Sequence, residues 1–248
     1  MTAIAVRNIL IDSRLRESGD ENSFNYTLKW SVLNAETVSL ESVQLYHTQY
    51  TINNNNNKLY WTDSAAAAHV STLTNGNYTA TALAAHLTTI MNTDDTSAGD
   101  TYTVSFSPLT SKITFYNDTS NFSLTFGTNT SGSVAYTIGF ADSNKTGSAS
   151  YVAEDVVRLN PKYYLIYCDA IPVNTYKADE SNTIIAILPV SVNYGDMVDY
   201  SSQLAKTFKI NNRQVANMRF EVKDDRGNVA DLNGVDWSMN LVVSIKSQ

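Results

Sequence analysis

The stretch that decides the fold class lies near the end of the chain and reads Trp237-Ser238-Met239-Asn240-Leu241-Val242-Val243-Ser244-Ile245. Every second side chain, beginning with Trp237, is large and apolar, and most of those between are small and polar. Successive side chains of a strand point to opposite faces of the sheet. The stretch therefore predicts a β-strand with one buried face.

Other segments repeat this pattern or a more apolar one. Phe24, Tyr26, Leu28 and Trp30 alternate with polar residues, which predicts a second half-buried strand. Residues 163–169 and 184–192 are almost entirely apolar, as expected of strands covered on both faces. The composition agrees, because Thr, 15 Tyr and 8 Phe favour strands while the many Asn and Ser favour turns.

A change of phase interrupts one of the early strands. Val38 and Leu40 have one parity, whereas Val43 and Leu45 have the other. Both pairs can face one core only if the strand contains an extra residue. We expect a β-bulge near Glu41-Ser42.

Residues 65–145 have a different pattern from their surroundings. Thr79 is a predicted helix N-cap, and Leu83, Leu87, Ile90 and Met91 follow at helical spacing. Hairpin strands are predicted over 101–106 and 113–116, and a short helix over 133–140 that ends at Gly139. Before this region, the unbroken Asn run at 53–57 predicts a solvated loop.

The order of these elements predicts an all-β fold. Crossover helices are absent from the pattern, so the sheets are expected to be antiparallel. The predicted architecture is a jelly-roll sandwich with an inserted helix-plus-hairpins module. The jelly roll would comprise residues 1–64 and 146–248, and the module residues 65–145.

Charge and hydropathy exclude several classes of partner. The chain has 248 residues and a net charge of −7, and no run of its 17 Lys and Arg exceeds two. Direct nucleic-acid binding is not expected, because it requires clustered cations. No apolar run approaches the about 20 residues of a spanning helix, so no transmembrane anchor is expected, and the first residues do not resemble a signal peptide.

The sequence offers few groups for catalysis. Cys168, the single cysteine, lies in an apolar run and is interpreted as a core residue. His47, His69 and His86 lack metal-binding spacing. A hydrolase using the carboxylate pairs Asp94-Asp95, Asp179-Glu180 or Asp224-Asp225 is the weakest hypothesis, because each pair lies in a turn-like stretch. We therefore predict no enzyme, no catalytic residues, no cofactor and no metal.

An ordered set of segments resembles a known family. The set is Ile11-Asp12-Ser13-Arg14, Asn22 to Leu28, Val38 to Ile52, Gly76-Asn77-Tyr78-Thr79, Lys112 to Phe115, Ile138-Gly139-Phe140 and Asp236-Trp237-Ser238. Together they resemble the penton, or minor capsid, proteins of virophages, polinton-like viruses and some giant DNA viruses. The resemblance extends along nearly the whole chain, although the chain has no proline at Tyr46 to Thr48, where family members often carry one.

The resemblance implies a structural role in a virion. Such a protein would form homopentamers at the fivefold vertices of an icosahedral capsid, contact the major capsid protein, and assemble in the host cytoplasm or virus factory. The alternative is a carbohydrate- or receptor-binding fibre or spike head, for which exposed aromatic side chains in residues 65–145 would be needed.

Overall fold

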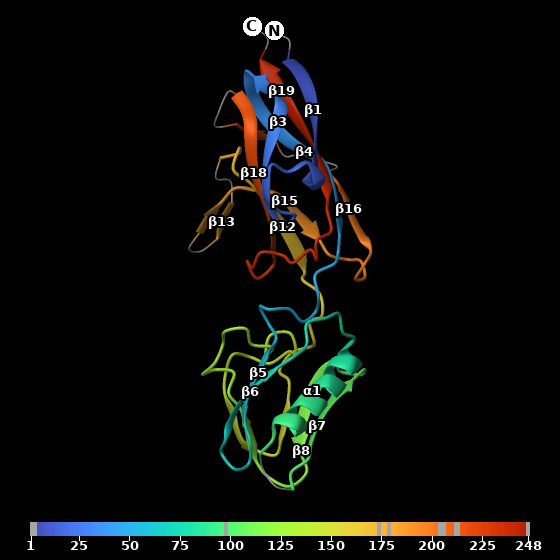
Figure 1. Cartoon of the computed structure of the whole chain (residues 1–248), viewed down its shortest axis with the longest axis vertical. Helices are drawn as coiled ribbons and strands as arrows, with labels where there is room; N and C mark the ends of the chain where they lie inside the picture. Colours follow the sequence, from blue (N-terminus) through green and yellow to red (C-terminus); the bar gives the residue numbers. More distant parts are fainter. Residues whose placement is uncertain are drawn as a thin grey trace. The chain divides into compact units, whose positions relative to one another are not determined.

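The chain is mostly β-structure in a computed structural model that describes residues 4–96, 99–172, 175–177, 180–202, 207–210 and 214–246. Strands account for 49% of it and helix for 8%, which confirms the all-β prediction. The chain divides into two compact units (Figure 1). Each unit has its own hydrophobic core. Unit 1 comprises residues 1–49 and 161–248, and unit 2 comprises residues 50–160.

Unit 1 contains two large antiparallel sheets. The first has the order β1 (Ile4–Asp12), β19 (Ser238–Lys246), β4 (Ala35–Tyr46) and β16 (Met197–Ser201), and β17 (Thr207–Lys209) also pairs with β4. The second has the order β15 (Ile184–Pro189), β12 (Tyr163–Cys168), β18 (Gln214–Asp224), β3 (Ser23–Leu33) and β2 (Ser18–Asp20). A short helix, η1 (Ser13–Leu15), and the two-stranded ribbon β13 (Thr175–Lys177) and β14 (Glu180–Asn182) complete the described elements.

The strand order of unit 1 is that of a jelly roll. Along the chain, its long strands follow one another as β1, β3, β4, β12, β15, β16, β18 and β19. The first, eighth, third and sixth of these form one sheet, and the second, seventh, fourth and fifth form the other. Consecutive strands thus often change sheet, which is the arrangement of two Greek keys. Unit 2 is inserted between the third strand and the fourth.

The core of unit 1 lies between the two sheets, as the alternation in the sequence predicts. Met239, Leu241 and Val243 of β19 are all buried there. In β3, Phe24 and Tyr26 are buried too, but the prediction for Trp30 is wrong, since Trp30 is 79% exposed. The pairing of β3 with β18 shifts register between Thr27 and Val32, so extra residues interrupt the alternation at this point.

The predicted bulge in β4 is confirmed. Asn240 of β19 pairs with Ser42, whereas the next residue, Leu241, pairs with Leu40. Glu41 is the extra residue between them. The bulge lets Val38 and Leu40 share one core with Val43 and Leu45 despite their opposite parity.

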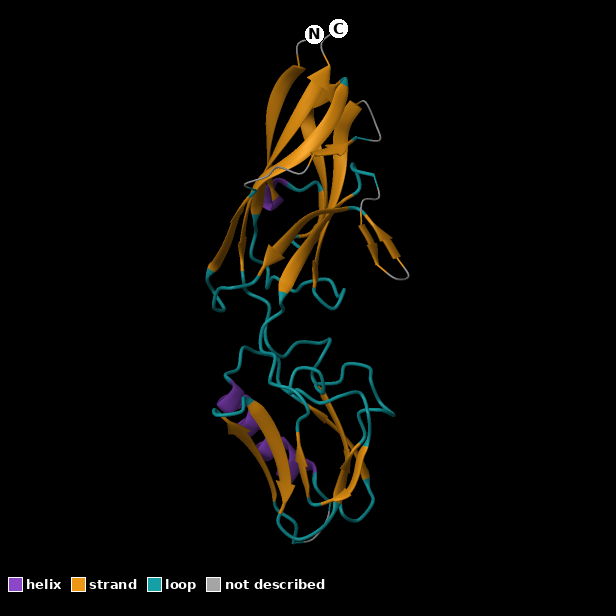
Figure 2. Cartoon of the chain, turned by 180° about the vertical axis from the view of Figure 1, so that it is seen from behind, coloured by secondary structure: helices purple, strands orange, loops and turns teal. Residues whose placement is uncertain are grey.

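Unit 2 combines two small antiparallel sheets with one helix (Figure 2). One sheet has the order β10 (Lys145–Ser148), β9 (Phe122–Leu124), β5 (Lys58–Thr62) and β6 (Ala68–Thr72). The other has the order β11 (Ser150–Val152), β8 (Lys112–Asn117) and β7 (Tyr102–Ser107). The helix α1 (Ala80–Asp94) packs against β7 and β6.

The unit boundaries differ from the expected ones. The module was predicted over residues 65–145, whereas unit 2 spans 50–160. The difference arises because β5 pairs with β6 and β9, and β11 pairs with β8. Both strands have their partners within the insertion, so they belong to unit 2 rather than to the jelly roll.

The helix forms where the sequence predicts it. The hydroxyl of Thr79 accepts a hydrogen bond from the N–H of Ala82, which is the interaction expected of an N-cap. Leu83, Leu87 and Met91 are buried in the core of unit 2, and Ile90 packs against it. The helix extends to Asp94, slightly beyond the stretch of apolar spacing.

Two local predictions in unit 2 are wrong. Residues 135–139 form turns rather than a helix, and the N–H of Val134 donates to the carbonyl of Lys58, which ties the segment to β5. The Asn run is not a solvated loop throughout. Asn53, Asn56 and Asn57 are buried, and Asn56 Nδ2 donates to the carbonyl of Thr51 and to the hydroxyl of Thr137.

Candidate functional site

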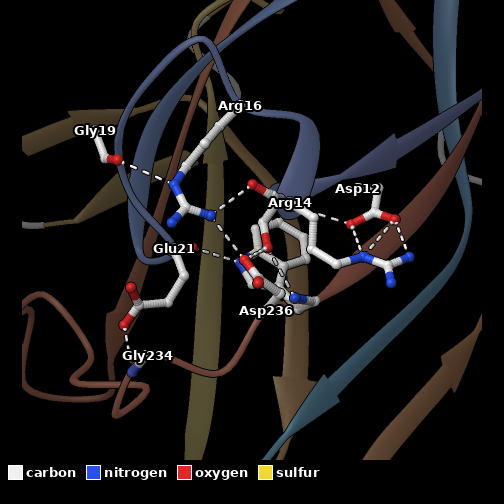
Figure 3. Close-up of polar contacts among 9 residues, drawn as sticks. Asp12, Arg14, Arg16, Gly19, Glu21, Gly234 and Asp236 are labelled. Atoms are coloured by element: carbon white, nitrogen blue, oxygen red, sulfur yellow. Dashed lines mark hydrogen bonds and ion pairs between the residues drawn. The ribbon is translucent and has the colours of Figure 1, made fainter.

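The polar cluster that joins the two ends of the jelly-roll sequence is the candidate site, and we call it the clasp. It consists of Asp12, Ser13, Arg14, Arg16, Gly19, Glu21, Gly234, Asp236 and Trp237 (Figure 3). One half follows β1 and the other half precedes β19. These two strands pair along their whole length, so the residues next to them meet although they lie more than 200 positions apart.

Ser13 lies at the centre of the clasp and is completely buried. Its hydroxyl donates to Asp236 Oδ1 at 2.7 Å and accepts from the N–H of Trp237 at 2.9 Å. The N–H of Ser13 donates to the carbonyl of Trp237 at 2.9 Å. The hydroxyl thus both donates and accepts a hydrogen bond, which leaves no buried polar group of Ser13 unsatisfied.

Two arginines complete the clasp. Arg16 Nη1 donates to Asp236 Oδ1 at 2.7 Å and to the carbonyl of Ser13 at 2.8 Å, and its Nε donates to the carbonyl of Gly19. Arg14 Nε donates to both carboxylate oxygens of Asp12. The hydrogen bonds from Arg14 outweigh partial burial and lower the pKa of the Asp12 carboxyl. Both aspartates are therefore neutralised by guanidinium groups.

Glu21 and Trp237 anchor the outer part of the clasp. The indole Nε1 of Trp237 donates to the carbonyl of Glu21 at 2.7 Å, and the carboxylate of Glu21 accepts from the N–H of Gly234 at 3.0 Å. The ring of Trp237 packs edge-on against Phe24 with centroids 5.7 Å apart. Trp237 thus belongs both to the clasp and to the hydrophobic core.

This arrangement favours a structural role over catalysis. Ser13 has a carboxylate neighbour but is inaccessible to a substrate, and its hydroxyl proton is already donated to Asp236. A hollow of about 260 Å³ adjoins the clasp at Arg14, Tyr46 and Met197. Its ionic groups, Asp12, Arg14 and Asp236, are held in the ion pairs of the clasp.

A second polar cluster secures the points where the chain leaves and re-enters unit 1. His47 Nδ1 lies 2.8 Å from the hydroxyl of Tyr164, and Gln49 Nε2 donates to Asp224 Oδ2 at 3.3 Å. The hydroxyl of Thr48 donates to the carbonyl of Leu232. Burial raises the pKa of Tyr164 above its usual range. His47 is thus part of a buried structural network.

The other two histidines have structural partners within unit 2. His69 Nε2 lies 2.8 Å from Asp63 Oδ2, and its ring stacks on Trp61 with centroids 4.4 Å apart. His86 accepts from the N–H of Thr74. Within the described residues, no group of three or more His, Cys, Asp or Glu side chains could hold a metal ion.

The described carboxylate pairs lie in different units, one in a turn and the other at the end of a helix. Asp224 Oδ1 accepts from the N–H groups of Arg226 and Asn228, as the predicted turn requires. Asp94 and Asp95 end α1 in the other unit. Asp179 lies outside the described residues, so the pair Asp179-Glu180 cannot be placed.

Comparison with known proteins identifies the fold. The chain matches no protein-family model, and no curated protein sequence matches it. Its structure is similar to the crystal structure of the mavirus penton protein, with a TM-score of 0.51. The similarity covers 98% of this chain and 100% of that one, at 10% sequence identity. The chain has a penton-like fold.

The clasp brings the first and last segments of the ordered sequence set together. Ile11-Asp12-Ser13-Arg14 and Asp236-Trp237-Ser238 were matched as separate segments, and the structure brings them into contact. Sequence reasoning missed Arg16 and Glu21, because both lie outside the segments of the ordered set. Within the described residues, no helix has the length and apolar character needed to span a membrane.

Proposed function

We propose that this chain is a structural capsid protein that forms homopentamers at the fivefold vertices of an icosahedral virion. The observation that carries the proposal is the similarity to the mavirus penton protein over the full length of both chains. The similarity covers 98% of this chain, so it extends over both of its units.

The chemistry of unit 1 supports this role. The polar groups of the clasp are occupied by one another, so they stabilise the fold rather than present reactive atoms. Only 17% of the residues are charged, which limits repulsion between identical subunits packed side by side. In the virion, the pentamer would contact the surrounding major capsid protein.

The test is assembly of the full-length chain. Native mass spectrometry of the purified protein should give a closed five-chain species, as head-to-tail contacts around a ring require. Cryo-electron microscopy of particles formed with the major capsid protein of the same virus should place that species at the vertices. A chain that stays monomeric and never enters particles would contradict the proposal.

The burial of aromatic residues does not favour the glycan-binding alternative. Of the aromatic side chains in residues 65–145, Tyr116 is the one that is largely exposed, at 47%. Tyr102, Phe115 and Phe122 are buried in the core of unit 2, where they pack against other aromatic rings or aliphatic side chains. A carbohydrate platform would need several exposed rings close together.

A further inference from the structure

The strand β1 has an open edge in unit 1. Along one side it pairs with β19 at nine consecutive positions, from Ile4 with Lys246 to Asp12 with Ser238, without a register shift. No strand of the described residues pairs with its other side. A long, regular edge without a bulge or proline readily binds another chain.

The strand β3 provides a second open edge next to the first. The short strand β2 covers β3 only at residues 23–25, which leaves residues 26–33 without a strand on that side in the described structure. The hydroxyl of Tyr26 reaches the carbonyl of Leu10 at 3.4 Å and links the two edges. Between them lies a groove of about 660 Å³.

Large apolar side chains are exposed around this groove. We call this area the β1–β3 surface, and it consists of Arg7, Leu10, Lys29, Trp30 and Leu33. Trp30 is 79% exposed, Leu10 65% and Leu33 58%. An exposed tryptophan among aliphatic side chains is typical of a protein-binding surface. Arg7 and Lys29 flank the groove and form no ion pair with the described residues.

The opposite edge of the first sheet, at β16, carries the complementary charge. We call this area the β16 surface, and it consists of Tyr46, Ile187, Asp196, Met197 and Asp199. Its apolar side chains are exposed by 41% to 51%, and both aspartates are exposed. β16 is the outer strand of one described sheet, and β15 is the outer strand of the other.

From this complementarity we infer that the β1–β3 surface of one chain binds the β16 surface of a second copy. The inference rests on the proposed function and names its subunit contact. Pairing two β1–β3 surfaces would bring Arg7 and Lys29 of both copies together, whereas the β16 surface offers Asp196 and Asp199. Unlike surfaces produce head-to-tail contacts, which close into a ring if the rotation allows it.

Charge reversal tests the pairing directly in the full-length protein. The double variant Arg7→Glu/Lys29→Glu should raise the concentration for half-maximal assembly at least about tenfold, and Asp196→Lys/Asp199→Lys should do the same. The quadruple variant Arg7→Glu/Lys29→Glu/Asp196→Lys/Asp199→Lys should assemble again, because every contact around a five-membered ring then joins opposite charges. Sedimentation velocity measures the assembly of each of the three samples, and thermal melting checks that each variant is folded.

A single substitution tests the apolar part of the β1–β3 surface. Trp30→Ser should weaken assembly at least about tenfold without lowering the melting temperature, because the side chain is outside the core. Leu109→Ser is the matched control, since Leu109 is 94% exposed but lies in unit 2. Equal effects of the two substitutions would overturn the inference.

The remaining outcomes separate this inference from the proposed function. If the wild-type chain forms pentamers that charge reversal leaves unchanged, the assigned surfaces are wrong and the proposed function stands. If charge reversal prevents entry into particles but leaves self-association intact, the β1–β3 surface binds the major capsid protein and the inference is overturned. A wild-type chain that is monomeric at every concentration overturns the inference, and its absence from particles would also contradict the proposed function.

Discussion

At the scale of single residues, the polar side chains of unit 1 act mainly as connections between distant parts of the chain. Ser13 and Asp236 join the loop after β1 to the approach to β19. A buried hydroxyl is useful there because it can donate to a carboxylate and accept from a backbone N–H simultaneously. The contribution of the Ser13 hydroxyl to stability is therefore best measured by a substitution that removes its oxygen alone.

We expect Ser13→Ala to lower the free energy of unfolding by about 2 kcal/mol, because the buried N–H of Trp237 would lose its acceptor. Urea unfolding followed by tryptophan fluorescence measures this change. Ser191→Ala, at an exposed serine outside the clasp, should change stability by less than about 0.5 kcal/mol. Equal effects of both substitutions would contradict the role of the clasp.

Cys168 should be chemically inert in the folded chain. Its side chain is buried in the core of unit 1, and burial raises the pKa of the thiol to about 12. Very little thiolate is therefore present at pH 8. Ellman's reagent should label the thiol only after guanidinium chloride is added, and rapid labelling of the native protein would show that Cys168 is accessible.

At the scale of elements, a glycine in a turn allows two segments of unit 2 to approach each other closely. Gly139 has a φ of +84°, and a Cβ built on it would lie 2.3 Å from the carbonyl oxygen of Asp155. The N–H of Asp155 donates back to the carbonyl of Gly139, so the two segments are in direct backbone contact. Only glycine permits both the dihedral angle and this approach.

A pair of glycine substitutions separates these two effects. Gly147 has a similar φ of +78°, but a Cβ there would meet no atom within 4 Å. Gly147→Ala should therefore cost only the dihedral strain, about 1–2 kcal/mol. Gly139→Ala should cost clearly more, because the clash with Asp155 is added. Thermal melting of both variants would reveal the difference, and equal melting temperatures would refute it.

The carboxylate of Asp63 makes unit 2 sensitive to acid. Burial alone raises its pKa, but hydrogen bonds from Thr96, His69 and the N–H of Ala67 outweigh burial and hold the pKa well below its usual value of 3.8. Because the folded-state pKa is depressed, its stabilisation is complete above pH 3.8 and is lost as the pH falls toward the folded-state value.

The corresponding variant is Asp63→Asn. Near pH 7 the wild type should be more stable than this variant, and the difference should shrink steadily as the pH falls below about 4. Urea unfolding at several pH values measures both proteins in parallel. A difference that is the same at pH 7 and pH 3 would show that the charge of Asp63 contributes nothing.

At the scale of the whole molecule, the chain forms two separate hydrophobic cores. The core of unit 1 is built from residues before 49 and after 161, and the core of unit 2 from residues between 50 and 160. No residue belongs to both clusters. Two cores of this kind can lose their structure in separate cooperative steps.

We therefore expect damage to one unit to leave the other protected. In the Ser13→Ala protein, amide hydrogen exchange should accelerate in residues 4–49 and in the described part of 161–246. The amides of α1 and β8 in unit 2 should exchange as in the wild type. Mass spectrometry of peptides locates the change, and uniform acceleration across both units would contradict this view.

The sequence by itself determined the features that depend on neighbouring residues. Alternation in β19 indicated a half-buried strand, the change of phase indicated the bulge at Glu41, and Thr79 indicated the start of α1. Each of these follows from backbone geometry within a few residues. The fold class was therefore predictable, and so was the interruption of the jelly roll by a different module.

Only the tertiary structure decided the features that depend on distant partners. The clasp requires Ser13 and Asp236 to meet, and strand pairing brings them together. The boundaries of unit 2 differ from the predicted ones because β5 and β11 pair with strands of the insertion. Trp30 is exposed, although local alternation predicted that it would face the core, because the register of β3 shifts between Thr27 and Val32. The physical reason is that local periodicity shows which side chains share a face, whereas the strands that cover that face are chosen by the whole fold.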